Sequence, residues 1–183
     1  MSFTATHYLN LFLGAGAVAL QAGSLLALFL LFVRADKNKK NSYLEFIDLH
    51  YLKLGFLISL LAALFSLVYS EVIGFLPCYL CWYQRIFIFP LPFIFGVAIW
   101  HKDRKIVKYV LPLLLVGFVI SVYQNFYYYF APAAGPCDAS SISCYQQLVS
   151  VFGGYISIPM LSLTTFLALL TVVLVAHFYK KED

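Results

Sequence analysis

The chain of 183 residues is too apolar for a soluble domain, since 63% of its residues are hydrophobic, 11% are charged and its mean hydropathy is +0.88. This composition excludes a water-soluble enzyme. The formal net charge of +4 comes from basic residues whose placement is explained by orientation in a membrane, so no nucleic-acid partner is expected. An aromatic content of 19% suits a helical bundle with a belt at each membrane interface.

Five apolar segments are long enough to cross ~30 Å of hydrocarbon, which takes about 20 helical residues. In chain order they are 8–33, 54–73, 82–100, 109–130 and 158–178. The sequence therefore predicts an all-α integral membrane protein. Its four-helix transmembrane bundle is expected in residues 54–183, preceded in residues 1–53 by an extra N-terminal transmembrane helix and a cytoplasmic connector.

Local patterns add three expectations. Pro90, Pro92 and Pro112 stand inside two apolar segments and predict kinks there. Apolar residues at helical spacing in 43–51 predict a short helix lying on the inner membrane surface. The same kind of spacing in 141–152 predicts a second surface helix on the outer side.

The basic residues predict the orientation of the chain. Of the 12 Lys and Arg residues, eleven fall in the two loops and the one tail that would share a side: Arg34, Lys37, Lys39, Lys40, Lys53, Lys102, Arg104, Lys105, Lys108, Lys180 and Lys181. The positive-inside rule puts these in the cytoplasm, so the N-terminus is expected outside and the C-terminus inside a plasma membrane crossed several times. The exception is Arg85, whose cation at membrane depth marks it as a functional candidate.

Under this topology all four cysteines lie on the extracytoplasmic side, where disulfides persist. Cys78 and Cys81 stand where a loop meets the third helix, directly after Pro77. The free N–H groups and positive dipole end of a helix N-terminus stabilise a thiolate, which is the form that exchanges disulfides. This pair is therefore a candidate redox centre.

Arg85 follows Cys81 by four residues and Cys78 by seven, which predicts one shared helical face. A fixed cation there could stabilise a thiolate and the negative charge that develops on a reduced carbonyl compound. An apolar electron acceptor dissolved in the membrane would fit this arrangement. Flat apolar side chains nearby offer walls for its ring: Phe75, Trp82, Phe87 and Phe89.

Cys137 and Cys144 form a second pair in a small polar loop, suited to presenting a disulfide to the thiol of another protein. No metal site is expected. Zinc would need convergent ligands at short spacing, whereas the four histidines are scattered over both sides at helix ends: His7, His50, His101 and His177.

Less specific interpretations stay open beside these. The four cysteines could form two structural disulfides in a membrane scaffold without catalytic activity. Arg85 could be an interfacial residue that extends its charge to the headgroups. Glu71 could likewise face the headgroups, or it could be the partner of Arg85.

The segment 75–85, FLPCYLCWYQR, resembles the active-site segment of the DsbB family of membrane quinone:thiol oxidoreductases. The stretches 70–75 (SEVIGF) and 153–159 (GGYISIP), with the Cys137 and Cys144 loop, are similar to the BdbC branch of that family. The resemblance covers about residues 54–178. The helix before it is a departure, because family members begin with the equivalent of the second helix.

The resemblance implies a direction of electron flow. A reduced, soluble, DsbA-like oxidase of the thioredoxin fold would attack the Cys137–Cys144 disulfide at Cys137. Cys144 would then attack Cys78, and Cys81 would pass the electrons to ubiquinone or menaquinone beside Arg85.

The resemblance implies that Arg85 lies beside the quinone, and Trp82 is a candidate to bind the quinone ring as one of its flat apolar walls. Family members often carry a histidine near the outer end of the penultimate helix, where this chain has Tyr123, Gln124 and Asn125. Gln124 is therefore a candidate for positioning a quinone carbonyl. A runner-up enzyme, which resembles vitamin K epoxide reductase, would carry its CxxC in a later helix.

Overall fold

The computed structural model describes residues 3–33, 41–130, 149 and 151–179. Within these ranges the protein is helical apart from turns and one isolated antiparallel bridge between Val151 and Ile156. The elements in chain order are α1 (Phe3–Val33), α2 (Ser42–Leu67), the π-helical turn η1 (Val68–Val72), α3 (Tyr79–Ile88), α4 (Pro90–His101), the 3₁₀ turn η2 (Arg104–Ile106), α5 (Val107–Phe130) and α6 (Ile158–Phe178).

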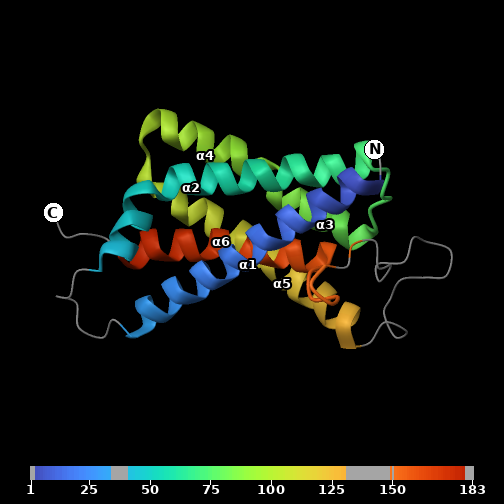
Figure 1. The fold of residues 1–183 in the computed structure, drawn as a ribbon. Helices are drawn as coiled ribbons and strands as arrows, with labels where there is room; N and C mark the ends of the chain where they lie inside the picture. Colours follow the sequence, from blue (N-terminus) through green and yellow to red (C-terminus); the bar gives the residue numbers. More distant parts are fainter. Residues whose placement is uncertain (1–2, 34–40, 131–148, 150, 180–183) are drawn as a thin grey trace.

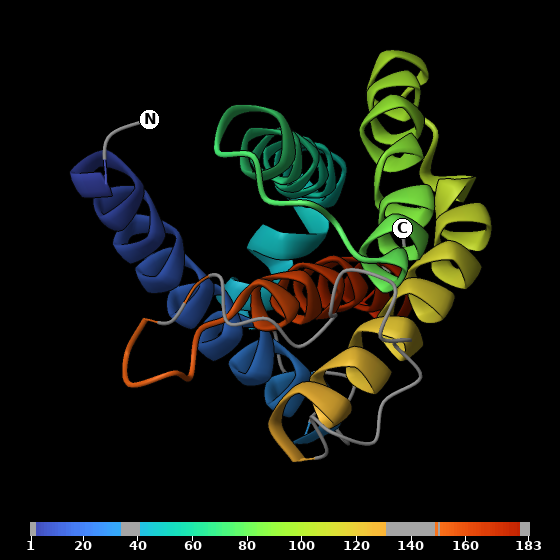
Figure 2. The ribbon, with the colours of Figure 1, turned by 90° about the vertical axis from the view of Figure 1, so that its right-hand side faces the viewer.

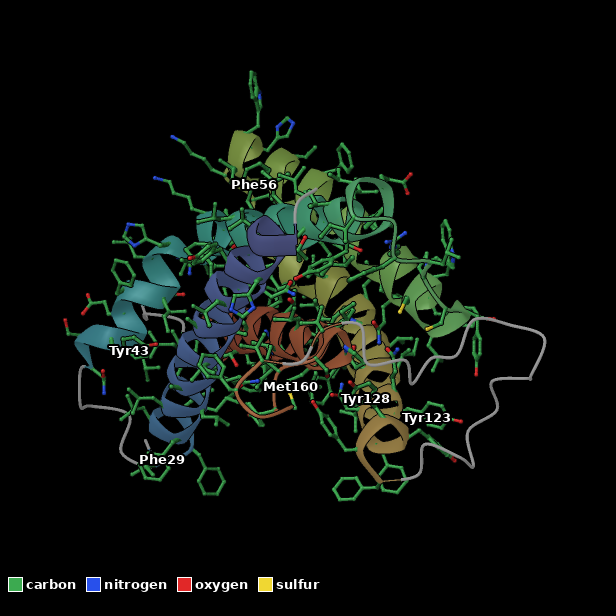
Figure 3. All side chains as sticks on the ribbon, turned by 45° about the vertical axis from the view of Figure 1, so that its right-hand side comes forward. Phe29, Tyr43, Phe56, Tyr123, Tyr128 and Met160 are labelled. Atoms are coloured by element: carbon green, nitrogen blue, oxygen red, sulfur yellow. The ribbon has the colours of Figure 1, made fainter. Side chains whose placement is uncertain are left out.

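These elements make five helical segments that are long and apolar enough to span a membrane. They are Thr6–Val33, Ser42–Val72, Tyr79–His101, Arg104–Phe130 and Ile158–Phe178. The prediction of an all-α, multi-pass membrane protein is thus confirmed. Side chains such as Phe29, which is 62% exposed and projects away from the bundle in Figure 3, are available to face lipid.

Helix α6 occupies the centre of the bundle. It packs against α1, α2 and α5, which surround it together with α3 and α4 in the end-on view of Figure 2. No charged residue interrupts α6, so every side of this helix can be buried against a neighbour. Gly117 of α5 permits especially close packing, because a Cβ there would overlap the ring of Phe166.

Helix α2 corrects the prediction of a surface helix in residues 43–51. Asn41 caps α2 by accepting a hydrogen bond from the Tyr43 backbone N–H (3.0 Å), and the helix then runs unbroken from Ser42. Its apolar residues Leu44 and Ile47 are buried in the protein core rather than in the membrane surface. Helical spacing indicates a buried face, but it does not say whether lipid or protein covers that face. The expected domain boundary after residue 53 falls inside this helix.

The third membrane segment is divided, as its prolines predict. Helix α3 ends at Ile88 and α4 begins at Pro90, with Phe89 between them. Proline lacks the N–H that would continue the helical hydrogen bonds, so a helix can start but not continue at this point. Pro112, by contrast, is accommodated inside α5 without ending that helix.

The expected outer surface helix in 141–152 falls largely outside the described residues, and its last part is not helical. Val151 and Ile156 exchange backbone hydrogen bonds of 3.1 Å and close a tight turn. Phe152, Gly153 and Gly154 in this turn all have positive φ angles, which a right-handed helix cannot contain. The two consecutive glycines were the signal for a turn rather than a helix.

The ends of the elements divide between the two ends of the bundle. In Figure 1 the start of α1, the start of α3, the end of α5 and the start of α6 lie at the right-hand end, whereas α2 starts at the left. The Cys78 and Cys81 segment therefore shares an end with the two helix termini that flank residues 131–157. Its placement outside the cytoplasm remains a prediction from the basic residues.

Reporter fusions test this orientation. A reporter fused after Asp183 should be active in the cytoplasm, and one fused before Met1 should be active outside, because eleven basic residues would otherwise have to be translocated. A C-terminal reporter that is active outside would contradict the predicted orientation and place the cysteines in the reducing compartment.

Candidate active site

Cys78 and Cys81 are held at the N-terminus of α3. The chain leaves η1 through Gly74, whose φ of +84° is a conformation that suits glycine, and reaches α3 by way of Pro77. Cys78 is the N-cap of α3, and its carbonyl accepts a hydrogen bond from the Trp82 N–H (3.1 Å). Cys81 therefore lies in the first helical turn, near the free N–H groups, as the sequence predicts.

The two thiols form one compact pair. Their Sγ atoms are 3.2 Å apart, within hydrogen-bonding distance for sulfur. Cys78 is 6% exposed, and Cys81 is partly buried. Two sulfur atoms this close need little movement to exchange between a dithiol and a disulfide.

A glutamine amide of α5 contacts this pair, and a second glutamine, from α3, orients that amide. Gln124, which is 1% exposed, directs its Nε2 at both sulfurs, at 3.6 Å from Cys78 Sγ and 3.7 Å from Cys81 Sγ. Gln84 of α3 donates from its own Nε2 to Gln124 Oε1 at 2.8 Å. This second hydrogen bond fixes the orientation of the Gln124 amide, so that its N–H groups rather than its oxygen face the sulfurs.

Arg85 is buried, with 8% of its surface exposed, and it joins α3 to α2. Its Nε donates to Ser66 Oγ (3.0 Å), and its Nη2 donates to the Ser66 carbonyl (2.9 Å). The guanidinium carbon lies 5.4 Å from the ring centre of Trp82 and 5.9 Å from that of Phe89. These aromatic faces add a favourable cation–π environment.

No carboxylate neutralises Arg85 among the described residues, where the ion pair found is that of Arg104 with Asp48. Glu71 is exposed and accepts a hydrogen bond from Ser70 Oγ (3.0 Å), so the alternative in which it faces the headgroups is favoured. Since the Ser66 contacts are neutral, the positive charge of Arg85 is available to a ligand.

A cavity of about 540 Å³ lies beside these groups, between α1, α2, α3 and α6. Cys81, Gln84 and Arg85 stand on its wall, with Ser66, Tyr69 and Ser70 close by on α2 and η1. Most of the remaining lining is aliphatic or aromatic. This size and composition are typical of a site for a small organic molecule.

The structure brings together most, but not all, of the side chains that the sequence singles out. Phe75 lines the cavity, whereas Trp82, Phe87 and Phe89 are not among its lining residues. Trp82 is 57% exposed and contributes by its contact with the Arg85 guanidinium. Gln124 lies behind the sulfurs, and it too is not among the residues that line the cavity. Cys137 and Cys144 lie outside the described residues.

Three features of this site escape the sequence analysis. Ser66 holds Arg85, Gln84 orients Gln124, and α1 contributes one wall of the cavity. The sequence does contain evidence for Gln84, because a polar residue in an apolar helix, three positions after Cys81, must find a hydrogen-bonding partner inside the protein. No comparable signal distinguishes Ser66 from other serines in membrane helices.

Comparison with known proteins agrees with this geometry. The family profile described as Disulfide bond formation protein DsbB matches residues 50–176, a span that begins inside α2 and ends two residues before the end of α6. The chain belongs to the DsbB family. Helix α1 lies wholly outside the matched residues.

Curated relatives carry names of the same kind. The chain is 38% identical over 122 residues to Disulfide bond formation protein C of Bacillus subtilis, an alignment covering 66% of this chain and 87% of that protein. It is 33% identical over 134 residues to Probable disulfide formation protein C 2 of Bacillus anthracis, covering 73% and 95%. It is 37% identical over 131 residues to a Probable disulfide formation protein of Coxiella burnetii, covering 70% and 87%. No solved structure matches the chain.

Family membership places this chain among the membrane oxidoreductases of disulfide bond formation. The named Bacillus relatives are consistent with the BdbC branch. The predicted fold class and family are therefore confirmed.

Substitution of Gln124 tests the amide arrangement. Gln124→Leu removes the donor to both sulfurs, and a hydrogen bond to a charged group contributes about 1.5–3 kcal/mol, so thiolate reactivity should fall about tenfold or more. Gln84→Leu should cause a smaller loss, because Gln124 remains but is no longer oriented. The rate of alkylation of the reduced Cys78 and Cys81 pair measures both effects.

Ser121→Ala is the matched control for this experiment. It removes another buried polar group of α5, whose hydroxyl donates to the Gly117 carbonyl (2.9 Å), one turn away from Gln124. Equal alkylation rates in Gln124→Leu and Ser121→Ala would show that the amide does not act on the sulfurs.

Proposed function

We propose that this protein is a membrane thiol:quinone oxidoreductase. It would reoxidise a soluble, DsbA-like dithiol oxidase of the thioredoxin fold outside the cytoplasm and pass the electrons to ubiquinone or menaquinone. The observation that carries this proposal is the position of Cys81 and buried Arg85 on the wall of one apolar cavity. In each cycle two thiols of the partner become a disulfide, and their two electrons and two protons convert quinone into quinol.

The residues at this cavity fit a quinone. A quinone, when bound, supplies the two-electron acceptor that neither the thiols nor the other side chains can provide. Arg85 has five N–H donors, and its hydrogen bonds to Ser66 use two of them, which leaves donors for a carbonyl oxygen. The uncompensated charge of Arg85 would stabilise negative charge developing on that oxygen.

The two cysteines of α3 stand in different surroundings, which supports separate roles. Cys81 is on the cavity wall, whereas Cys78 is not among the lining residues and caps the helix at the end of the bundle. The proposed relay uses this difference. A thiol of the partner opens the Cys137–Cys144 disulfide at Cys137, freed Cys144 attacks Cys78, and Cys81 leaves as a thiolate beside the acceptor.

The positions of the helix ends and of the basic residues support an extracytoplasmic site for this relay. The end of α5 and the start of α6, which flank residues 131–157, share an end of the bundle with Cys78. The basic residues that are predicted to be cytoplasmic belong to the other connections, to the starts or ends of the helices beside them and to the C-terminal tail, apart from Lys53, which lies within α2.

Arg85→Ala tests quinone use directly. Purified protein supplied with reduced thioredoxin-fold oxidase should reduce quinone, which is followed by loss of quinone absorbance. Arg85→Ala should lower kcat/KM for quinone about 100-fold, the usual effect of removing one donor to a developing oxyanion. Arg85→Lys should be impaired less, since it keeps the charge but loses the planar donors.

Ser66→Ala separates the charge of Arg85 from its anchoring. This variant removes one hydrogen bond of Arg85 and keeps the cation, so its decrease in kcat/KM for quinone should be much smaller than that of Arg85→Ala. Thiol exchange with the partner should continue in all three variants. Unchanged quinone turnover in Arg85→Ala would contradict the proposed function.

A trapping experiment tests the relay order. Thiol exchange proceeds through a mixed disulfide that the resolving thiol clears, so Cys144→Ser should accumulate an adduct of the partner with Cys137. A non-reducing gel would detect the adduct, and mass spectrometry would identify the linked cysteine. The double variant Cys137→Ser, Cys144→Ser should lose the adduct. An adduct through Cys78 or Cys81 in the single variant would overturn the order.

A further inference from the structure

Helix α1 contributes to the cavity although it lies outside the segment that matches the family. Five of its residues line the cavity wall opposite α3: Phe12, Leu13, Gly16, Ala17 and Leu20. These positions recur at helical spacing and form one face of α1. The helix that precedes the family core is therefore built into the candidate site rather than appended to its surface.

Polar contacts hold this face of α1 in place. Near its start, Asn10 Oδ1 accepts a hydrogen bond from the Tyr69 hydroxyl at 2.6 Å. Further along, Gln21 donates to Thr164 Oγ1 at 2.7 Å and accepts from the Tyr155 hydroxyl at 3.0 Å. The lining residues lie between these two attachment points. Between these two points α1 crosses α6 obliquely and packs against it, as Figures 1 and 2 show.

The cavity is long and has two different ends. Its lining on α2 and η1 runs from Ser70 to Leu54, a length of about 24 Å at 1.5 Å per residue. Ser66, Tyr69 and Ser70 are grouped at the end near Cys81, whereas the far end is lined on this side by Leu54, Leu57, Ile58 and Leu61. Because Asn10 contacts Tyr69, α1 follows the same course, with Phe12 toward the polar end and Leu20 toward the apolar end.

The hydroxyl groups of α6 on this wall do not make the far end polar. Thr164 and Thr165 donate to the carbonyls of Met160 and Leu161 in their own helix, at 2.8 Å and 2.9 Å. Ser162 shares a hydrogen bond of 3.3 Å with Ser121. The cavity thus presents a reactive polar end and an apolar extension, which is the shape of a molecule with a polar ring and a hydrocarbon tail.

We propose that α1 forms one wall of a channel for the isoprenoid tail of the electron-accepting quinone, and that Gly16 keeps this channel open. The inference rests on the proposed function, because a tail channel has a use only if a lipid quinone is the acceptor. Gly16 is exposed and belongs to the cavity lining, and a Cβ placed on it would meet no protein atom within 4 Å, so the space in front of this glycine is open. A larger side chain there would extend into that space.

Gly16→Leu in the full-length protein tests the channel. The apparent KM for a quinone with an isoprenoid or decyl tail should rise about tenfold, since the leucine displaces two or so buried methylene groups of the tail. The KM for the same quinone ring without a tail should stay unchanged. Tailed quinone that co-purifies with the protein, extracted and quantified per mole of protein, should fall in parallel and provides a readout independent of turnover.

Two further variants complete the design. Ala15→Leu adds a leucine at the neighbouring position of α1, which is exposed and is not among the lining residues, and it should leave both KM values and the bound quinone unchanged. Gly16→Ala should shift the same quantities in the same direction as Gly16→Leu but by less. It keeps the test valid if the larger side chain prevents folding.

Other outcomes are distinguishable. If Gly16→Leu changed the apparent KM equally for tailed and tail-less quinones, the proposed tail channel would be wrong and α1 would instead line the site of the quinone ring. Loss of co-purified phospholipid from Gly16→Leu, with the KM for tailed quinone unchanged, would overturn it in favour of an acyl chain as the occupant. Failure of the unsubstituted protein to reduce either quinone would instead contradict the proposed function, and the tail channel with it.

Discussion

A guanidinium inside the hydrocarbon layer must find its partners within the protein, and the arrangement of this molecule around Arg85 follows from that requirement. Ser66 supplies two acceptors from α2, and Trp82 and Phe89 supply aromatic faces from the same segment as Arg85. These contacts set the distance of α3 from α2 and thereby one side of the cavity. Because all of them are neutral, they solvate the charge without cancelling it, which leaves a buried cation on the same cavity wall as the Cys81 thiol.

The same constraint explains the polar contacts between the other helices. Gln84 and Gln124 satisfy each other across α3 and α5 and leave N–H groups directed at the sulfurs. Asn125 donates at 2.8 Å to the carbonyls of Ser121 and Pro159, which joins α5 to the start of α6. Where lipid is the solvent, such hydrogen bonds have no competition from water, so a few of them can determine how apolar helices are placed. Side chains of the candidate site thus also make hydrogen bonds that hold the helices of the bundle together.

Hydropathy, charge and the cysteine spacing are enough to predict the five membrane segments, the CxxC at a helix start and the position of Arg85 one turn after Cys81 in that helix. They do not reveal what covers each apolar face, since a leucine suits lipid and protein equally well. This is why the spacing in 43–51 predicts a surface helix although Leu44 and Ile47 lie in the core, and why no pattern in α1 shows that it lines the cavity. The turn at Phe152 to Gly154 was missed for another reason, because apolar spacing outweighed the two glycines that specify it. Partners separated by many residues, such as Arg85 and Ser66, leave no local pattern to read.

The junction at Phe89 and Pro90 divides the third membrane segment into two helices with different surroundings. Helix α4 is fixed in the core by Leu91 and Phe95, which are almost completely buried. Helix α3 carries Cys78 and Cys81 at its start, and it is held by side-chain hydrogen bonds to α2 and α5. At the junction the Phe89 N–H still donates to the Arg85 carbonyl (3.0 Å), whereas Pro90 has no N–H with which to continue the helix. The helix that positions the thiols is therefore distinct from the helix that completes the core, although both belong to one membrane segment.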